Sequence, residues 1–307
     1  MSRVEEARRR AAGRDVESRR HPDVKSVGDA VADVSVLDNY PLERPGAERV
    51  SPVHALRTIA APRRATSGHL GSLDPKLDGK LVGSRDTPPI VVEQYRRLAS
   101  TLHHLQIDEG LKTLLVASAM PRDGKTLTIT NLALTLSGSY RRRVLLIDAD
   151  LRRPSLHEVF RLPKTTGLAE ALRSGSRPNF LELSPLLSIL PAGEVDGDPL
   201  GALTSNRFTA LLDQCVAAFD WVLLDAPPVG LMPDGKVLAK LTKAVVFVIG
   251  AGTTPYKLIE RAIAEIGRDS IVGTVLNRID EDQLSTAKGY GGYGDYGDYY
   301  STTDPSK

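Results

Sequence analysis

Short apolar runs alternate along the middle of the chain with stretches that suit helices, and this alternation limits the possible folds more than any other feature. The runs cover residues 113–118, 143–148, 187–191, 221–226, 244–250 and 271–276. Their length and their richness in valine, leucine and isoleucine suit strands that are buried on both faces. The sequence therefore predicts an α/β fold with a doubly wound, mostly parallel sheet and right-handed crossovers.

The loop after the first run suits phosphate binding. It ends in Gly124-Lys125-Thr126, and Lys125 to Leu136 suits a helix. In such a unit, backbone N–H groups and a helix N-terminus surround the phosphates, the lysine reaches the β- and γ-phosphates, and the hydroxyl binds Mg²⁺. Two positions depart from the general pattern. Ala119 replaces its first glycine, and Arg122 stands where a small residue would let the backbone approach phosphate most closely.

Two later runs end in carboxylates: Asp148 and Asp150 end one, and Asp225 ends the other. Ligands of open parallel sheets bind at the carboxyl ends of the strands, so we expect these acids to face phosphates held by Lys125. Asp148 and Asp225 would hold Mg²⁺ or its waters, and Asp150 would accept the proton of an attacking hydroxyl. A plainer interpretation is that each aspartate only ends a strand or caps the next helix.

Taken together, these motifs resemble those of the bacterial protein-tyrosine kinases, the BY-kinases of capsule and exopolysaccharide systems. The matching stretches are Pro121 to Thr126 as Walker A, Leu145 to Pro154 as the family's additional Walker A′, Asp225 to Pro228 as Walker B, Gly167-Leu168, Leu190 to Gly193, Ser205 to Phe208 and Leu276 to Arg278. The resemblance runs from about Glu93 to the end of the chain. It implies a P-loop NTPase type of fold and a kinase that transfers phosphate from ATP to tyrosine.

The resemblance also assigns roles to residues. It implies that Lys125, Asp148, Asp150 and Asp225 are catalytic, and that Thr126, Asp148 and Asp225 hold Mg²⁺. It implies that ATP contacts Pro121, Arg122, Asp123, Gly124, Lys125, Thr126 and Leu127, with Asn277 near the adenine. A polar residue that follows a strand can also simply start a turn, so Asn277 has a second interpretation.

Residues Glu93 and Arg96 match a helix of the form Glu-x-x-Arg-x-x-Arg, which joins subunits of the family into a ring, but Ala99 replaces the last arginine. The apolar residues Val91, Tyr95, Leu98, Leu102 and Leu105 follow helical spacing. The same segment is therefore also explained as an amphipathic helix that packs on the core. A homo-oligomer remains an expectation that rests on the resemblance.

Five tyrosines near the end of the chain are candidate phosphate acceptors: Tyr290, Tyr293, Tyr296, Tyr299 and Tyr300. Their segment is too rich in glycine to build a core, and a flexible acceptor can enter the active site of a neighbouring subunit. With a phenol pKa of about 10, the hydroxyl is protonated near neutrality and needs a base such as Asp150. Each phosphate would add about −1.5 to −2 charges and would drive a ring apart. The alternative is a low-complexity tail without chemistry.

Composition and length divide the chain into three parts: residues 1–85 as a largely disordered arm, residues 86–286 as the P-loop kinase domain, and residues 287–307 as a flexible acceptor tail. The single cysteine, Cys215, suits a reducing cytoplasm and, by its spacing, the core. A net charge of +2 gives no reason to expect nucleic acid. No apolar run approaches the ~20 residues that span a membrane. The resemblance implies recruitment to the inner face of the membrane by a membrane-embedded polysaccharide co-polymerase that activates the kinase.

Two other functions stay open. One is an ATPase switch like the septum-site and plasmid-partition ATPases, although those proteins have a signature lysine where this chain has Met120. The other is a nucleotide-binding scaffold with weak catalysis, which Arg122 and the missing first glycine keep open. Nucleotide affinity distinguishes the scaffold from the two enzymes, and phosphotyrosine distinguishes the kinase from the switch.

Overall fold

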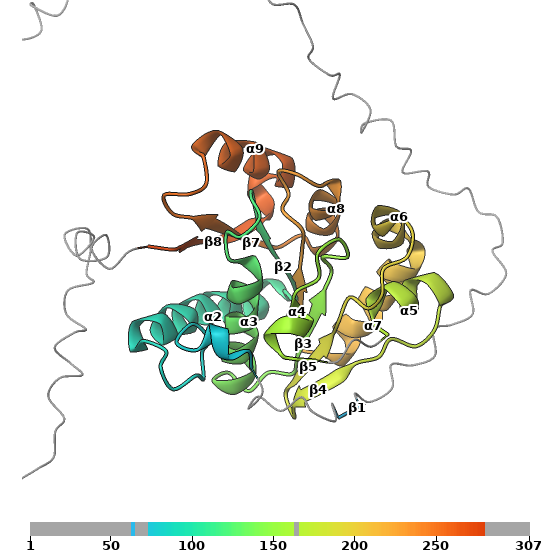
Figure 1. The fold of residues 1–307 in the computed structure, drawn as a ribbon, viewed down its shortest axis with the longest axis horizontal. Coiled ribbons are helices and arrows are strands. Elements are labelled where there is room, and N and C mark those ends of the chain that lie inside the picture. Colours follow the sequence, from blue (N-terminus) through green and yellow to red (C-terminus); the bar gives the residue numbers. More distant parts are fainter. Residues whose placement is uncertain (1–62, 65–72, 163–165, 280–307) are drawn as a thin grey trace, which may run out of the picture. The chain divides into compact units, whose positions relative to one another are not determined.

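A computed structural model describes residues 63–64, 73–162 and 166–279, which build one eight-stranded sheet with helices on both faces (Figure 1). The strands are β1 (Arg63–Arg64), β2 (Thr113–Ser118), β3 (Val144–Asp148), β4 (Leu181–Ser184), β5 (Leu187–Leu190), β6 (Trp221–Asp225), β7 (Val245–Gly250) and β8 (Ile271–Asn277). Their order in the sheet is β1-β4-β5-β3-β6-β2-β7-β8, and only β4 and β5 pair antiparallel. The predicted doubly wound, mostly parallel sheet is confirmed.

Eight α-helices and two short 3₁₀ helices belong to the described residues. The α-helices are α2 (Pro89–Glu109), α3 (Lys125–Gly138), α4 (Leu156–Val159), α5 (Leu168–Ser174), α6 (Pro199–Thr204), α7 (Asn206–Ala218), α8 (Pro233–Thr242) and α9 (Tyr256–Ile266); the 3₁₀ helices are η3 (Pro75–Leu77) and η4 (Arg268–Ser270). The helix predicted from Lys125 is α3, which runs two residues beyond the expected Leu136.

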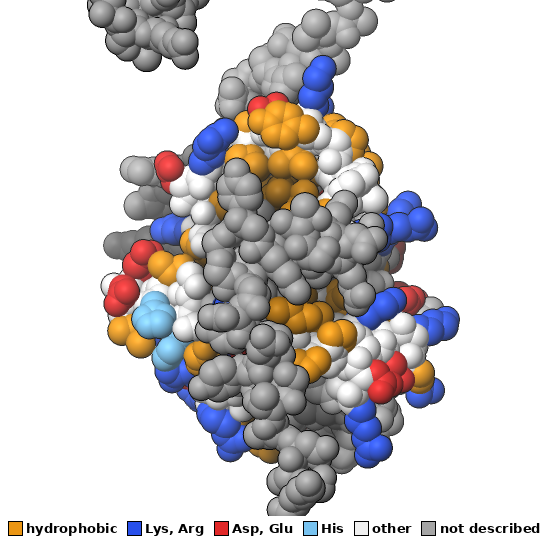
Figure 2. Space-filling model, turned by 90° about the vertical axis from the view of Figure 1, so that its left-hand side faces the viewer, with side chains coloured by type: hydrophobic (Ala, Val, Ile, Leu, Met, Phe, Trp, Pro, Cys, Tyr) orange, Lys and Arg blue, Asp and Glu red, His pale blue; other side chains and the backbone are white. Residues whose placement is uncertain are grey.

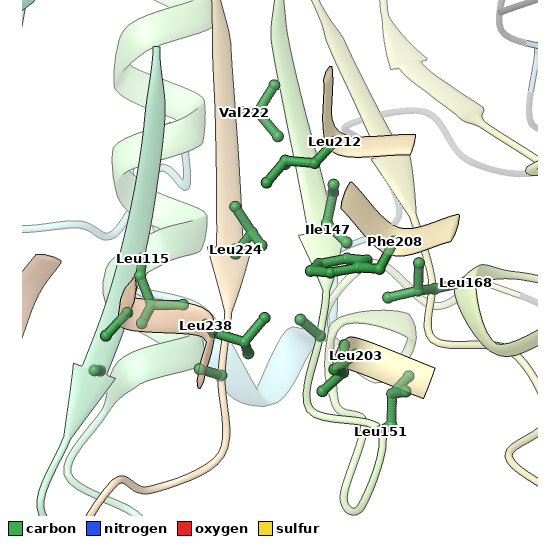
Figure 3. Close-up of a cluster of buried hydrophobic side chains, with 14 of the residues drawn as sticks. Leu115, Ile147, Leu151, Leu168, Leu203, Phe208, Leu212, Val222, Leu224 and Leu238 are labelled. Atoms are coloured by element: carbon green, nitrogen blue, oxygen red, sulfur yellow. The ribbon is translucent and has the colours of Figure 1, made fainter. Parts of the chain in front are cut away.

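Alternate residues of the central strands supply two hydrophobic cores, one on each face of the sheet. Leu114 and its neighbours pack with α2 and α3, whereas Leu115 packs on the opposite face with α7, α8 and α9. Figure 3 shows the second core, where Phe208 of α7 meets Ile147 of β3. The α7 residues predicted to be core, including Cys215, are buried, and burial raises the pKa of the Cys215 thiol to about 12.

The hairpin of β4 and β5 was not predicted from the sequence. Only one side of β4 is buried, whereas the predicted strands are mostly buried on both sides. Only a two-residue turn, Pro185-Leu186, separates the two strands, so the sequence of residues 181–190 shows no clear break between them. The place of β4 between β1 and β5 depends on tertiary pairing, which periodicity in a short run does not reveal.

The predicted boundary between arm and domain, at residue 85, stays a prediction, but the segment before it contacts the domain wherever it is described. Leu81 is 1% exposed and belongs to the core on the α2 and α3 face. The amide of Asn131 in α3 accepts from the Val82 N–H at 2.7 Å and donates to the Lys80 carbonyl at 2.9 Å. Residues 1–62, 65–72 and 280–307, with the five candidate acceptor tyrosines, lie outside the described residues.

Candidate nucleotide and magnesium site

The candidate site lies where β3, β6 and β2, three adjacent strands, end at the same edge of the sheet. Asp148 at the end of β3 and Asp225 at the end of β6 are partners in the register of these strands. The Thr126 hydroxyl, in the first turn of α3, donates to Asp225 Oδ2 at 2.7 Å. The structure thus brings the predicted lysine, hydroxyl and carboxylate residues into one place, because parallel strands carry their carboxyl ends to a common edge.

The backbone of the phosphate loop has two left-handed residues, Arg122 at φ 66° and Gly124 at φ 106°. This conformation explains why a small residue suits position 122. Asp123 is buried and fixes the loop: one carboxylate oxygen accepts from the Met120 N–H at 3.0 Å, and the other accepts from the Thr254 hydroxyl at 2.7 Å.

Asn277, the last residue of β8, and the next residue, Arg278, hydrogen-bond to the backbone of the phosphate loop. The Asn277 amide donates to the Asp123 carbonyl at 2.8 Å, and the Arg278 guanidinium donates to the Arg122 carbonyl at 2.5 Å. A Cβ on Gly124 would lie 2.0 Å from Asn277 Nδ2, so the close packing here requires glycine. Asn277 therefore lies at the phosphate loop, and its predicted adenine contact stays a prediction.

Lys125 is 7% exposed and donates to the Ser118 hydroxyl at 3.2 Å. Burial lowers the pKa of Lys125, and the negative charges of Asp225, Asp150 and Asp123 oppose that shift. A buried ammonium without an ion pair at hydrogen-bond distance needs a charged ligand, and a phosphate is one that the loop can accept.

The two buried aspartates each keep one oxygen without a hydrogen-bond partner. Asp148 Oδ2 accepts from the N–H groups of Ser155 and Leu156, both at 3.0 Å, so this residue does cap α4 as the plainer interpretation expected. Its other oxygen, and Asp225 Oδ1, are buried and unpaired among the described residues. Burial raises the pKa of both carboxyls, to about 6 for Asp225, and their mutual repulsion raises that of Asp148 further.

These residues fit a magnesium ion. Mg²⁺ prefers oxygen ligands and usually takes only one or two carboxylates, completing its shell with phosphate oxygens and water. Thr126 and the unpaired oxygens of Asp148 and Asp225 are such ligands. In the described part of the chain, no group of three or more His, Cys, Asp or Glu side chains could hold a metal by itself. The site thus suits an ion that arrives with a phosphate-bearing ligand.

Asp150 lies on the loop beyond β3 and is half-buried, with Oδ1 accepting from the Arg153 N–H at 3.0 Å. Burial raises the pKa of its carboxyl. Two residues further on, the Arg152 guanidinium binds the Asp234 carboxylate at 3.1 Å, and Asp234 is 1% exposed at the start of α8. This ion pair ties the Asp150 loop to the segment after β6.

Sequence reasoning missed four residues of the site: Ser118, Ser155, Thr254 and Asp234. Ser118 and Asp234 had local signals, a polar residue ending a strand and an acid in the first turn after a proline. Thr254, which lies 131 residues from its partner Asp123, had none.

Glu93 and Arg96 form an exposed ion pair of 3.8 Å on α2. Ala99 is fully buried, so an arginine at this position would require the core to repack. The amphipathic interpretation of this helix is confirmed by its buried residues, Ala99 and Leu102. Figure 2 views the domain from the side of α2 and β8 and shows Lys and Arg side chains at its lower rim, below a group of hydrophobic side chains.

Comparison with known proteins adds the family. No family model matches the chain. The tyrosine-protein kinase YwqD of Bacillus subtilis is 31% identical over 204 residues, which cover 65% of this chain and 84% of YwqD. The succinoglycan biosynthesis transport protein ExoP of Rhizobium meliloti is 30% identical over 200 residues, 62% of this chain but 25% of ExoP.

A solved structure supports the same conclusion. The kinase domain of the Escherichia coli tyrosine kinase ETK aligns with a TM-score of 0.57 at 26% identity, over 62% of this chain and 78% of that domain. Sequence and fold thus point to the same class of protein. The chain therefore belongs to the bacterial protein-tyrosine kinases.

Proposed function

We propose that this kinase is an autokinase, which transfers the γ-phosphate of ATP to tyrosines of its own C-terminal tail and thereby regulates exopolysaccharide or capsule biosynthesis or export. One observation carries the chemistry: the buried ammonium of Lys125 lies at the same sheet edge as Thr126 and the unpaired carboxylate oxygens of Asp148 and Asp225. Such a set is suited to a nucleotide phosphate with its metal ion.

The nucleotide is held mainly by the loop from Pro121 to Leu127. The N–H groups at the start of α3 and the Lys125 ammonium face the phosphates, and Asn277 lies beside the loop. Thr126, Asp148 and Asp225 hold the metal. When bound, Mg²⁺ supplies positive charge against the phosphate oxygens.

Asp150 accepts the phenolic proton of the acceptor. A new bond forms between the phenol oxygen and the γ-phosphorus, the bond from that phosphorus to the β–γ bridging oxygen breaks, and ADP leaves. Burial raises the pKa of Asp150, which makes this carboxylate a stronger base than an exposed one. Asp150→Asn should suppress phosphotransfer and leave much of the nucleotide binding intact.

The proposed organisation follows the sequence: an arm over residues 1–85, the kinase domain over residues 86–286 and the acceptor tail over residues 287–307. A membrane-embedded polysaccharide co-polymerase recruits the kinase to the inner face of the membrane and activates it. ExoP is named as a transport protein, and this chain matches 25% of its length. This relation supports a kinase that works together with a transport component. None of the described helices has the length and apolarity needed to cross a membrane.

Self-association through α2 belongs to the same proposal. Glu93 and Arg96 are exposed on this helix, and Ile90 beside them is 47% exposed. Phosphates on the tails would then add repulsion between subunits. Equal association states of phosphorylated and unphosphorylated protein, measured with the activator present, would contradict this part.

The first test is phosphopeptide mass spectrometry of the full chain after incubation with MgATP. Phosphate is expected on the cluster from Tyr290 to Tyr300, and Lys125→Met should abolish it. The exposed Lys240 on α8 offers the matched control, Lys240→Met, which should leave the signal unchanged. The measurement is repeated in cells, where the activator is present. ATP turnover with an unmodified tail in both settings would instead support the ATPase switch.

A further inference from the structure

A pocket of about 480 Å³ lies beside the loop that carries Asp150, between α5, α6 and α7. These helices stand together beyond β5 at the right of Figure 1. The pocket shares a wall with the candidate site, because its lining includes Leu151, the residue next to Asp150. Figure 3 shows the Leu151 side chain close to Leu203, so the core fixes this wall.

The lining of the pocket combines an apolar floor with charged residues. The floor contains Leu151, Ala169, Leu172, Val195 and Ala202. Its charged residues are two arginines, Arg173 and Arg207, and two acids, Asp196 and Asp198. Such a lining suits an aromatic ring, because one face of the ring can pack on the apolar floor and the other can contact a guanidinium group.

Arg207 is held in place before any ligand arrives. Its guanidinium donates to the Leu172 carbonyl at 3.0 Å and to the Arg173 carbonyl at 2.6 Å, which caps the end of α5. The Arg173 side chain is 52% exposed and forms a long ion pair of 3.8 Å with Asp196, itself 89% exposed. Such an exposed pair is worth little, so Arg173 can exchange Asp196 for another carboxylate.

We propose that this pocket is a substrate subsite: it holds the ring of one tail tyrosine while another tyrosine, three residues away, meets Asp150. The inference rests on the proposed autokinase function and names where the acceptor binds. The occupant is the tail segment Gly289 to Tyr300, in which Tyr290, Tyr293, Tyr296 and Tyr299 recur every third residue. Three extended residues span about 10 Å, which suits two adjacent sites on either side of Leu151.

The two arginines of the pocket can pair with acidic residues of the tail, once Arg173 has released Asp196. Asp295 and Asp298 directly precede Tyr296 and Tyr299. A tyrosine ring on the apolar floor would bring the preceding carboxylate toward Arg173 and Arg207. Ion pairs at such a rim favour the correct register of the peptide more than they add affinity.

The tail is also long enough. The described chain ends at Ile279, next to the residues that hold the phosphate loop, and Tyr290 follows 11 residues later. Eleven extended residues reach about 36 Å. The pocket lies near β5, five strands from β8, a separation of about 24 Å at ~4.8 Å per strand.

The experiment uses two forms of the full chain. The enzyme carries alanine at the five tail tyrosines, and the substrate is the Lys125→Met chain with its natural tail. In the enzyme, Ala202→Trp fills the pocket and Arg173→Glu reverses its charge. Either change should raise KM for the substrate chain at least about fivefold, a loss of about 1 kcal/mol, with kcat and KM for ATP unchanged. Arg177→Glu, an exposed change outside the pocket, is the matched control and should have no effect.

A second substrate keeps Tyr296 and has alanine at the other four tail tyrosines. Its KM should already be raised with the unaltered pocket, and Ala202→Trp should raise it little further, because no second ring is present. Unchanged KM for the natural tail in folded pocket variants would overturn the subsite, as would equal KM values for the two substrates. Absence of any tail phosphorylation with the unaltered pocket would instead overturn the proposed function itself.

Discussion

At the residue scale, the site concentrates negative charge that the Lys125 ammonium offsets only in part. Asp148 and Asp225 are partners on adjacent strands, both are buried, and each keeps an unpaired oxygen. Lys125, the buried cation nearby, hydrogen-bonds to Ser118 and to no carboxylate. This arrangement destabilises the folded protein until a cation binds, because buried like charges repel strongly.

This charge makes the metal-free protein sensitive to pH through Asp225. Burial raises the pKa of this carboxyl from 3.8 to about 6, so the folded chain binds the proton more tightly than the unfolded chain. The stability that protonated Asp225 contributes is therefore fully present below pH 3.8 and is lost as the pH rises through about 6. Urea unfolding in EDTA should show this loss between pH 4 and pH 7, and Asp225→Asn should remove part of it. The prediction would be contradicted if the free energy of unfolding fell with pH in the same way for the Asp225→Asn variant and the unaltered protein.

Because the backbone at Arg122 is left-handed, the effect of its side-chain charge on nucleotide affinity can be tested separately from the effect of its backbone conformation. Asparagine and glycine tolerate this conformation, whereas a β-branched residue does not. Arg122→Gly and Arg122→Asn should therefore keep nucleotide affinity within about threefold, and Arg122→Val should weaken it about tenfold, or ~1.4 kcal/mol. Titration with an ATP analogue measures each. Equal losses for Arg122→Asn and Arg122→Val would mean that the guanidinium charge, and not the backbone, matters.

At the element scale, several stretches that the sequence resemblance singled out join helices to loops. Ser205 caps α7 by accepting from the Phe208 N–H at 3.3 Å, and Arg207 caps the end of α5. The Glu170 carboxylate accepts from the N–H groups of Gly167 and Glu194, both at 2.7 Å, and thereby ties α5 to the loop after β5. These residues stabilise the elements that line the pocket.

Gly167 shows how closely this junction is packed. A Cβ at this position would lie 2.1 Å from the Pro191 carbonyl, which accepts the Leu168 N–H and cannot move freely. We expect Gly167→Ala to lower the free energy of unfolding by about 2–3 kcal/mol. Gly138→Ala at the end of α3 is the control: its Cβ meets nothing within 4 Å, so stability should hold or rise by up to about 1 kcal/mol. Denaturant unfolding compares them, and similar results for both would refute the packing argument.

At the scale of the whole molecule, described residues before position 86 pack against the domain, so we expect the cooperative unit to extend beyond the predicted boundary. Leu81 lies in the same core as α2 and α3, and Asn131 holds the backbone on either side of it. This segment contributes to the fold through a single deeply buried leucine, so composition alone gives little sign of it.

Leu81→Ala tests this extension. Removing a fully buried leucine side chain should lower the free energy of unfolding by about 2–5 kcal/mol. Lys80→Ala, at the exposed neighbouring position, should change it by no more than about 0.5 kcal/mol. Chemical denaturation of both proteins gives the comparison. Unaltered stability of the Leu81 variant would show that residues 73–85 are not part of the cooperative domain.

The sequence by itself determined the parallel α/β class, the predicted strands, the start of a helix at Lys125 and Thr126, and the placing of Asp148 and Asp225 at strand ends. It could do so because buried strands carry continuous apolar runs and because parallel strands end at one edge. Only the tertiary structure decided which atoms meet. The contacts of Asp123 with Thr254, of Arg152 with Asp234 and of Asn131 with the segment around Leu81 join residues 49 to 131 positions apart. Local propensity and periodicity act over a few residues, so pairings at such separations depend on how the whole sheet packs.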